Sequence, residues 1–553
     1  MHTTGSSIRG MIIMATIGAS AAALAGDAGS GATNAAVALV QQAAGVKDAA
    51  LAAQEAKLRD HPLLRRFAES RRKLAADPYR PLYHFVSPES TLNDPNGLCF
   101  WNGRWHLFYQ AYPPENSNQH WGHTVSDDLI HWRDLPYAIK PGPENACYSG
   151  STLVESNRVI AMYHGTGQGN MVAIASDPLL LDWEKLTGKA VIPLAGAPCP
   201  VFDPCIWQKD GMYYALSGGA LPAFTAPNSH RAEFLFRSAD LKTWQYLHPF
   251  VEGDLFGYTG EDGACPYFWP IGNRYILLSF SHIGGGSFLL GDYNTARDKF
   301  VATQGGRFNF GAVAPSGVHA PSATPDGKGG VITIFNMNPG KTTPGWDQIM
   351  SLPRRLTLIG KDELGVEPAG HIESLRGTNR HLAGVSLPAN KEVVLAGVQG
   401  NALEMVAEID PGKARMIELN VLRSSGKEEY TRIVLFKQCG LQNWARNVDW
   451  KNNWYRTCDS LISLDTAYSS TLPDVTLRSP ETAPFWFDPD KPLKLRVFID
   501  KSVIEVFVNG RQCVAARVYP GRADSLGVSL RAQGSDAVLK QFDAWTMKSI
   551  YAE

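Results

Sequence analysis

The chain has 553 residues, of which 44% are hydrophobic, so it is long enough for two or three domains that each bury a core, and one small domain is excluded. Lysine and arginine number 52 against 53 acidic residues, and a formal net charge of -1 provides no basic field for nucleic acid or an anionic membrane. We therefore expect a small, uncharged partner, such as a small-molecule or oligosaccharide substrate.

Residues 1–26 match the pattern of a secretory signal peptide. One positive charge at Arg9 precedes the apolar stretch 11–18, and small residues continue to Ala25. The alternative is a disordered or membrane-anchored tail, because the segment is rich in alanine and only weakly hydrophobic. No later run reaches the roughly 18 apolar residues that a spanning helix needs. We expect a secreted or periplasmic protein with no integral membrane span, and the oligomeric state stays open.

Residues 27–78 are predicted to form a helical leader or linker. From about Ala35 to Ala76 the sequence is rich in alanine, leucine, arginine and glutamate, with apolar residues at roughly helical spacing. Asp77 and Pro78 end the pattern, because proline stops a helix.

Eight cysteines are spread along the chain, five of them before residue 370 and three after it. Both counts are odd, and the sequence assigns no disulfide pairing. No Cys-x-x-Cys pair and no His-Glu-x-x-His occurs, so a metal site has little support and no cofactor is expected. Most thiols are expected to be buried small hydrophobes.

From Tyr83 onward the sequence favours an all-β fold. Short apolar runs are bounded by glycine, asparagine, aspartate or proline, and Asn102-Gly103 and Asp210-Gly211 are two-residue hairpin signals. A short motif at 126–132 (SDDLIHW) is echoed at 238–244 (SADLKTW) and more loosely at 176–183 (SDPLLLDW). Recurring units of roughly fifty to sixty residues with about four strands each are typical of propeller blades.

Residues 79–370 are therefore predicted to form a β-propeller, in which the innermost strand of each blade points its first residues into a central funnel. After residue 370 the motif disappears, and alternating strands such as 493–499 and 503–508 precede the hairpin signal Asn509-Gly510. This change predicts a β-sandwich over residues 371–553.

Three acidic sites stand just before apolar strands. Asp94 lies in 93–97 (NDPNG), Asp203 lies 109 residues later, and Glu261 with Asp262 follows after another 58. Acids so far apart are expected in different blades and can converge on the funnel. Cleavage of an acetal needs an acid to protonate the leaving oxygen and a second carboxylate, about 5 to 5.5 Å away in retaining enzymes. Asp94 is the candidate nucleophile, and the alternative is an ordinary turn.

Aromatic side chains near these acids could offer apolar faces to a sugar, although propeller core is the alternative for each of them. They are Trp121, Trp207, Phe268 and Trp346.

Taken together, several motifs resemble glycoside hydrolase family 32, the invertases, inulinases and levanases. They cover about residues 80–550 and are LNDPNG at 92–97, LFYQ at 107–110, HWGHTVSDDLIHW at 120–132, YSGS at 148–151, FDP at 202–204, ACP at 264–266, GW at 345–346, LPRRL at 352–356, LRVFID at 495–500 and VIEVFVN at 503–509. The resemblance implies a five-bladed β-propeller followed by a β-sandwich.

The resemblance also implies roles for individual residues. Asp94 matches the nucleophile that forms a covalent fructosyl-enzyme, and Asp203 matches the carboxylate that stabilises the transition state by binding sugar hydroxyls. The substrate pocket of the family falls on Asn93, Gln110, Trp121 and Ser149, and Asp262 and Trp346 are further candidates for substrate binding. The alternatives for the first four are a turn residue, a strand amide, a core aromatic and a turn serine.

The sequence departs from the family at two places. Phe202 replaces the usual arginine of Arg-Asp-Pro, and Ala264 replaces the acid/base glutamate of Glu-Cys-Pro. A rearranged loop could bring Glu261 or Asp262 into the funnel, and we favour Glu261 as acid/base, assisted by the neighbouring Asp262. Otherwise both are solvated loop acids and normal catalysis is lost.

The sequence thus predicts a retaining glycoside hydrolase that cleaves β-fructofuranosidic bonds of the sucrose, inulin or levan type. Because the arginine before Asp203 is missing, a fructosyltransferase or a hydrolase of another furanoside is the nearest alternative. A carbohydrate-binding protein without turnover, or a propeller used only for protein contacts, are the alternatives from other classes.

Overall fold

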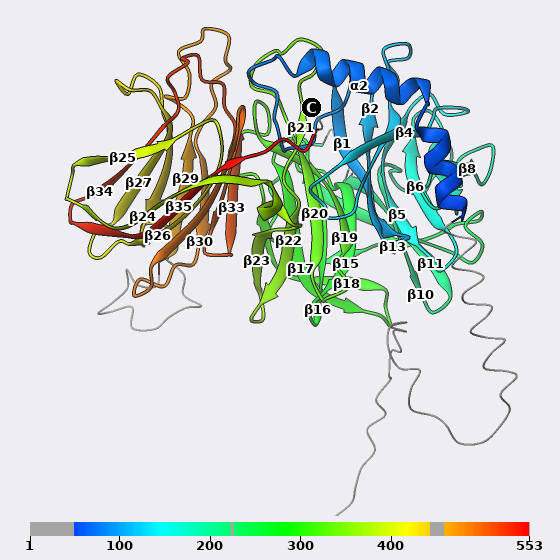
Figure 1. Ribbon diagram of the computed structural model, residues 1–553. Coiled ribbons are helices and arrows are strands. Elements are labelled where there is room, and N and C mark those ends of the chain that lie inside the picture. The colour runs from blue at the N-terminus through cyan, green and yellow to red at the C-terminus, as the bar shows by residue number, and fades with distance from the viewer. Residues whose placement is uncertain (1–48, 223–225, 443–457, 552–553) are drawn as a thin grey trace, which may run out of the picture. The chain divides into compact units, whose positions relative to one another are not determined.

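The structure, a computed structural model, describes residues 49–222, 226–442 and 458–551 (Figure 1). Nearly all of its regular elements are strands, which confirms the all-β prediction. The predicted signal peptide, residues 1–26, lies outside the described residues. Among the helices that are described, none is long and apolar enough to cross a membrane.

The helical leader is divided into two pieces by a proline. Residues 49–58 are helical, and a second helix, α2 (Pro62–Leu74), begins at a proline because this residue fits the first turn of a helix but not its interior. Phe67 of α2 is buried and packs its ring 5.5 Å from that of Tyr137 on strand β4 (Arg133–Ile139). Helix α2 therefore packs on the outer strand of the first blade.

Five sheets of four or five strands follow one another along the chain, and within residues 54–553 they belong to one compact unit. In blade order their strands are β1 (Leu92–Trp101), β2 (Arg104–Ala111), β3 (His120–Ser126) and β4; β5 (Cys147–Val154), β6 (Val159–Gly165), β7 (Gly169–Ala175), β8 (Glu184–Lys185) and β9 (Ile192–Pro193); β10 (Pro204–Lys209), β11 (Met212–Leu221), β12 (His230–Ser238) and β13 (Gln245–Pro249); β14 (Val251–Glu252), β15 (Ala264–Ile271), β16 (Arg274–Ser281), β17 (Gly285–Asn294) and β18 (Lys299–Arg307); and β19 (Val318–Pro325), β20 (Val331–Met337), β21 (Ile349–Met350), β22 (Arg354–Ile359) and β23 (Glu363–Pro368).

The first long strand of each sheet is the innermost one. Strands β1, β5, β10, β15 and β19 contact one another in this order, and β19 also contacts β1, which closes the ring. The five-bladed propeller implied by the resemblance is confirmed. In Figure 1 its blades run from blue through cyan to green.

The repeated sequence motif has one local task, which is to build the turn between the third and fourth strands of a blade. Its central leucine has a positive φ in all three copies, at Leu129, Leu180 and Leu241. In the first and third copies an aspartate, Asp128 or Asp240, accepts hydrogen bonds from backbone N–H groups two and three residues ahead. The aspartates thus stabilise a backbone conformation that leucine by itself disfavours.

The NDPNG segment, for which an ordinary turn was the alternative, is part of strand β1. Its register with β2 shifts twice, between Leu92 and Pro95 and between Asn96 and Cys99, and Gly97 has φ +50°. A Cβ atom at Gly97 would lie 2.7 Å from Cγ2 of Thr152 on β5, so the neighbouring blade leaves no room for a side chain. The turn-forming residues therefore produce bulges inside a strand, because the inner ring encloses this segment.

The second half of the chain forms two six-stranded sheets, drawn in yellow to red in Figure 1, which confirms the predicted β-sandwich. After the short 3₁₀ helix η1 (Ile372–Leu375), one sheet has the order β24 (Arg376–Leu387), β35 (Ala537–Met547), β26 (Ala402–Asp410), β31 (Leu493–Asp500), β32 (Val503–Val508), β33 (Gln512–Arg517), and the other β25 (Glu392–Gln399), β34 (Gly527–Gln533), β27 (Met416–Arg423), β28 (Thr431–Phe436), β29 (Ser460–Asp465), β30 (Glu481–Phe485). Buried aliphatic side chains of both sheets form one core.

All eight cysteines are among the described residues and none forms a disulfide. Six of them are buried, as predicted, and the other two are the half-buried Cys199 and the exposed Cys439.

One buried hydroxyl connects four of the five inner strands. The Tyr267 hydroxyl of β15 accepts the N–H of Gly97 on β1 (3.2 Å), donates to the carbonyl of Gly150 on β5 (2.8 Å) and lies 2.9 Å from the Ser322 hydroxyl of β19. Ser322 in turn accepts the N–H of Leu98 (2.9 Å). Tyr267 is 2% exposed, so water cannot replace these bonds.

We expect Tyr267→Phe to lower the free energy of unfolding by about 2 kcal/mol or more, because it leaves a buried N–H and a buried carbonyl without partners. The midpoint of urea unfolding measures this loss. Tyr275→Phe on the adjacent strand is the matched control, since its hydroxyl has no recorded partner among the described residues, and it should shift the midpoint by at most about 0.5 kcal/mol. Equal shifts in both variants would contradict this assignment.

Candidate active site

Each of the five blades supplies one residue to a single cluster of polar side chains. The cluster consists of Asp94 near the start of β1, Ser149 near the start of β5, Asp203 directly before β10, Cys265 at the start of β15 and His319 at the start of β19. The first residues of the inner strands meet, as the propeller geometry predicts. The sequence prediction that Asp94 and Asp203 come from different blades agrees with these positions.

Asp94 is held through both carboxylate oxygens. Its Oδ2 accepts a hydrogen bond from the Ser149 hydroxyl (2.7 Å), and its Oδ1 lies 3.3 Å from Nδ1 of His319. Burial by itself would raise the pKa of Asp94, but the contact and charge of His319, followed by the hydrogen bonds of Ser149 and Cys265, bring this pKa below its usual value. Asp94 is therefore ionised at neutral pH although only 7% of it is exposed.

Asp203 and Asp94 both lie next to the side chain of Cys265. The sulfur of Cys265 is 3.5 Å from Oδ2 of Asp94 and 3.5 Å from Oδ2 of Asp203, and the backbone N–H of Cys265 donates to the same oxygen of Asp203 (3.1 Å). Burial raises the pKa of Asp203, the charge of His164 opposes this rise, and the charge of Asp94 adds to it. Two acids with pKa values shifted in opposite directions can take different roles in one reaction.

Three more of the predicted pocket residues lie at or near this pair. Gln110 donates to the Ser149 hydroxyl (2.8 Å) and lies 3.5 Å from Asp94, whereas Asn93 accepts a hydrogen bond from Asn336 (3.0 Å). Trp121 is fully buried and donates its indole N–H to the carbonyl of Tyr148 (2.9 Å), so it positions the strand that carries Ser149.

The remaining predicted site residues are engaged elsewhere. Glu261 is 1% exposed, accepts a hydrogen bond from Arg307 (2.5 Å) and accepts the backbone N–H of Tyr258 (2.9 Å). Asp262 accepts both the backbone N–H and the Nδ1–H of His282. Trp346 is 2% exposed and donates to Asp77 (2.8 Å), so its ring packs where the leader joins the propeller.

Sequence reasoning missed His319, which contacts Asp94, and His282, which contacts Asp262. His319 lies at the start of an inner strand, as Asp94 does. The expectation that the first residues of inner strands point into the funnel would therefore have found it, once the inner strand of the fifth blade was recognised. His164 is 6% exposed, and its ring lies 5.7 Å from that of Phe202, the residue in the place of the family's arginine. The basic group near Asp203 is thus a histidine and not an arginine, and burial lowers the pKa of His164 while the charge of Asp203 opposes this.

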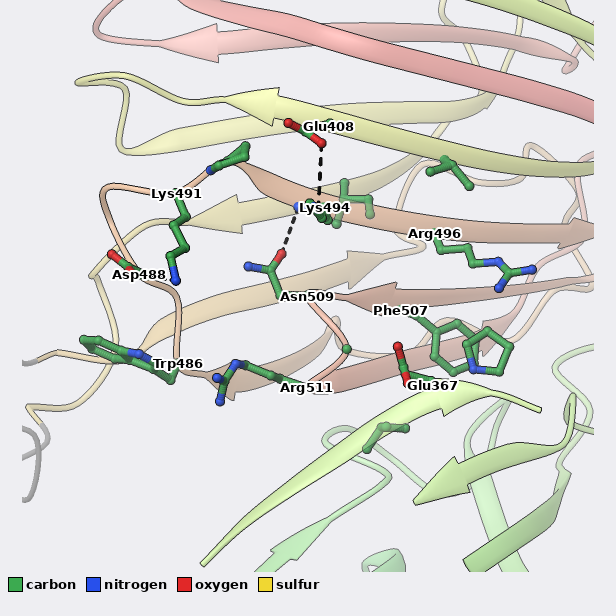
Figure 2. A pocket seen from close by; sticks show the side chains of 16 residues that line it. Glu367, Glu408, Trp486, Asp488, Lys491, Lys494, Arg496, Phe507, Asn509 and Arg511 are labelled. Atoms are coloured by element: carbon green, nitrogen blue, oxygen red, sulfur yellow. Dashed lines mark hydrogen bonds and ion pairs between the residues drawn. The ribbon is translucent and has the colours of Figure 1, made fainter. Parts of the chain in front are cut away.

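A groove of about 720 Å³ lies away from these carboxylates, between β23 and the sandwich strands (Figure 2). Its lysines have acidic partners: Lys494 lies 3.9 Å from Glu408, and Lys491 lies 3.5 Å from Asp488. None of the predicted catalytic residues lines it, so it is separate from the cluster at the inner strands. Among the described residues, no group of three or more His, Cys, Asp or Glu side chains could hold a metal ion.

Comparison with known proteins matches two family models to the chain. The description "Glycosyl hydrolases family 32 N-terminal domain" matches residues 84–368, and "Glycosyl hydrolases family 32 C terminal" matches residues 371–546. Similar curated proteins include a levanase of Bacillus subtilis, 27% identical and covering 86% of this chain and 71% of the levanase, and an insoluble β-fructofuranosidase isoenzyme of Oryza sativa subsp. indica, 29% identical and covering 84% and 90%.

Solved structures show the same fold. Fructan 1-exohydrolase IIa from Cichorium intybus superposes with a TM-score of 0.72 at 22% identity, covering 86% of this chain and 98% of that one. Sucrose-6-phosphate hydrolase from Lactobacillus gasseri gives 0.70 at 23% identity, with 89% and 98% covered. With both halves of the chain matched in order, and with two carboxylates brought together by the inner strands, the protein is a glycoside hydrolase that belongs to glycosyl hydrolase family 32.

Proposed function

We propose that the protein hydrolyses β-fructofuranosidic bonds of the sucrose, inulin or levan type and retains the configuration at the anomeric carbon. The observation that carries the proposal is the cluster at the inner strands, where an ionised Asp94 lies beside Asp203. The similar proteins named levanase and β-fructofuranosidase support the choice of bond.

In this mechanism Asp94 attacks the anomeric carbon of the fructosyl unit, and the glycosidic oxygen leaves with a proton. A nucleophilic carboxylate must be ionised, and His319 and Ser149 keep Asp94 in that form. Asp203 receives the sugar hydroxyls and stabilises the positive charge that develops on the ring. Water then attacks the fructosyl ester and releases fructose and free Asp94.

We expect Asp94→Asn to lower fructose release from sucrose, inulin and levan by roughly 10⁴-fold, because the amide cannot form the ester. Chromatography of the released sugars measures this. Asp127→Asn is the matched control, since that side chain is 81% exposed and its one ion pair among the described residues is with Arg104; it should leave the rate unchanged. Release of fructose by Asp94→Asn at the wild-type rate would disprove the assignment of the nucleophile.

The pH dependence tests how Asp94 is kept ionised. Because the Ser149 hydrogen bond lowers the pKa of Asp94, Ser149→Ala should raise that pKa, and activity should then be lost at a higher pH as the solution is acidified. The acid limb of kcat/KM should move upward by about one pH unit. Ser151→Ala, on the same strand but bonded to the N–H of Ile206, should leave the limb in place. If the acid limb of kcat/KM for Ser149→Ala stays at the wild-type pH, the ionisation of Asp94 does not control that limb.

A different furanoside or transfer to another sugar is a second candidate function, favoured by Phe202. This side chain is 39% exposed next to Asp203, where a family arginine would offer a charged donor. An apolar ring there changes which sugar hydroxyl can be bound. Measurement of kcat/KM on arabinofuranosides beside sucrose, and of oligosaccharide products at high sucrose, separates these activities from simple hydrolysis.

We further propose that the protein is exported, on the pattern of residues 1–26. The amino-terminal sequence of protein recovered from the periplasm or the medium should then begin near residue 26. Recovery from the cytoplasm with an intact amino terminus would contradict export.

A further inference from the structure

The cluster of carboxylates lacks a proton donor at the position that the family motif assigns. Ala264 occupies that position and cannot titrate. The leaving oxygen of a fructoside still has to be protonated, because an alkoxide is a poor leaving group. Another side chain close to Asp94 and Asp203 must therefore supply the proton.

We propose that His282 is the general acid and base of this site and that Asp262 is the positioning residue that holds it. This assignment rests on the proposed function.

The geometry of the two residues fixes the imidazole. His282 directly follows β16, and its backbone N–H donates to Oδ1 of Asp262 (3.0 Å) while its Nδ1–H donates to Oδ2 (2.8 Å). The Asp262 side chain is 8% exposed, whereas 71% of the His282 side chain is exposed. The carboxylate thus holds the Nδ1 edge of the ring, and Nε2 has no hydrogen-bond partner among the described residues. A histidine so arranged presents Nε2 to a ligand.

A continuous row of rings joins this pair to the nucleophile. The His282 ring lies 4.7 Å from that of Phe280, and Phe280 lies 4.1 Å from the ring of His319, both measured between centroids. His319 in turn contacts Asp94. The negative charges of Asp203 and Asp94 both act on His282, so the imidazole is within electrostatic reach of both carboxylates.

The charges around His282 favour its protonated form. The hydrogen bond that His282 donates to Asp262 raises the pKa of His282, partial burial opposes this, and the charges of Asp262, Asp203 and Asp94 raise it further. Arg307, a cation beside this loop, packs against Gly284 and is paired with Glu261. An imidazolium near neutral pH is the form that a general acid needs at the start of the reaction.

The other acids near Ala264 are less suited to the role. The hydrogen bonds of Glu261 to Arg307 and Tyr258 would have to break before it could protonate a sugar oxygen. Glu233 lies against Gly263, and burial raises its pKa to about 7, with Arg231 opposing this. Glu233 is only 1% exposed, however, whereas 71% of the His282 side chain is exposed.

The proton and electron balance of the two steps is complete. When Asp94 forms its bond to the anomeric carbon, the electron pair of the glycosidic bond goes to the leaving oxygen, which takes the proton from Nε2 of His282. In the second step the neutral Nε2 takes a proton from water as the water oxygen attacks the anomeric carbon and the carboxylate of Asp94 leaves. His282 ends protonated, as it began.

A leaving group that needs no proton provides the test. We expect His282→Ala to lower kcat/KM on sucrose by about 100-fold or more, yet to lower it less than about fivefold on 4-nitrophenyl β-fructofuranoside, because 4-nitrophenolate leaves unprotonated. Azide should restore turnover of the aryl fructoside by His282→Ala and yield fructosyl azide.

Asp262→Asn should move the basic limb of the pH profile on sucrose to lower pH, since the hydrogen bond that raises the His282 pKa is weakened.

The control is His381→Ala, which removes an exposed histidine that is paired with Asp543 in the sandwich at the same 2.8 Å; it should behave as wild type. Equal losses on both substrates in His282→Ala, or a loss confined to sucrose in Glu261→Gln or Glu233→Gln with His282→Ala unaffected, would overturn the assignment. Wild-type protein that cleaves neither fructoside would instead overturn the proposed function, and this assignment with it.

Discussion

The hydroxyl of Tyr267 is the contact on which the site depends, because it ties the strands that carry the reactive groups to one another. Four of the five inner strands meet at this group or at its partner Ser322. Their first residues then have no freedom to separate, and the side chains of Asp94, Ser149, Cys265 and His319 are held within hydrogen-bonding range. The same enclosure turns the NDPNG segment into a bulged strand.

Within this ring of strands, electrostatic interactions shift the pKa values of Asp94 and Asp203 in opposite directions. Asp94 is buried and Asp203 is partly buried, and desolvation raises the pKa of each. Asp94 overcomes this effect through His319 and Ser149, whereas Asp203 has fewer donors and lies beside the negative charge of Asp94. Neighbouring blades therefore set the protonation of each acid, and a single blade could not do so.

The two departures from the family motifs lie on either side of this pair. Phe202 replaces a cation beside Asp203, where His164 is now the nearby basic group, and Ala264 removes an acid from the start of β15. In both places a histidine is a titratable group of the surroundings: His164 acts on Asp203, and His282 is held by its buried partner Asp262. The sequence singled out Asp262 and Glu261 as possible acids. In the structure Glu261 pairs with Arg307 and Asp262 pairs with His282, and closeness in the sequence could not reveal these contacts.

The sequence by itself determined the all-β class, the repeating blade unit, the sandwich that follows and the identities of Asp94 and Asp203, because strand periodicity, turn residues and short motifs are local properties. Only the tertiary structure decided which side chains meet: that His319 contacts Asp94, that Trp121 and Trp346 are packed in the interior, that Glu261 pairs with Arg307 and that Asp262 holds His282. These contacts join residues from 20 to more than 200 positions apart, and they follow from the closure of the ring of inner strands, a constraint that no local pattern contains.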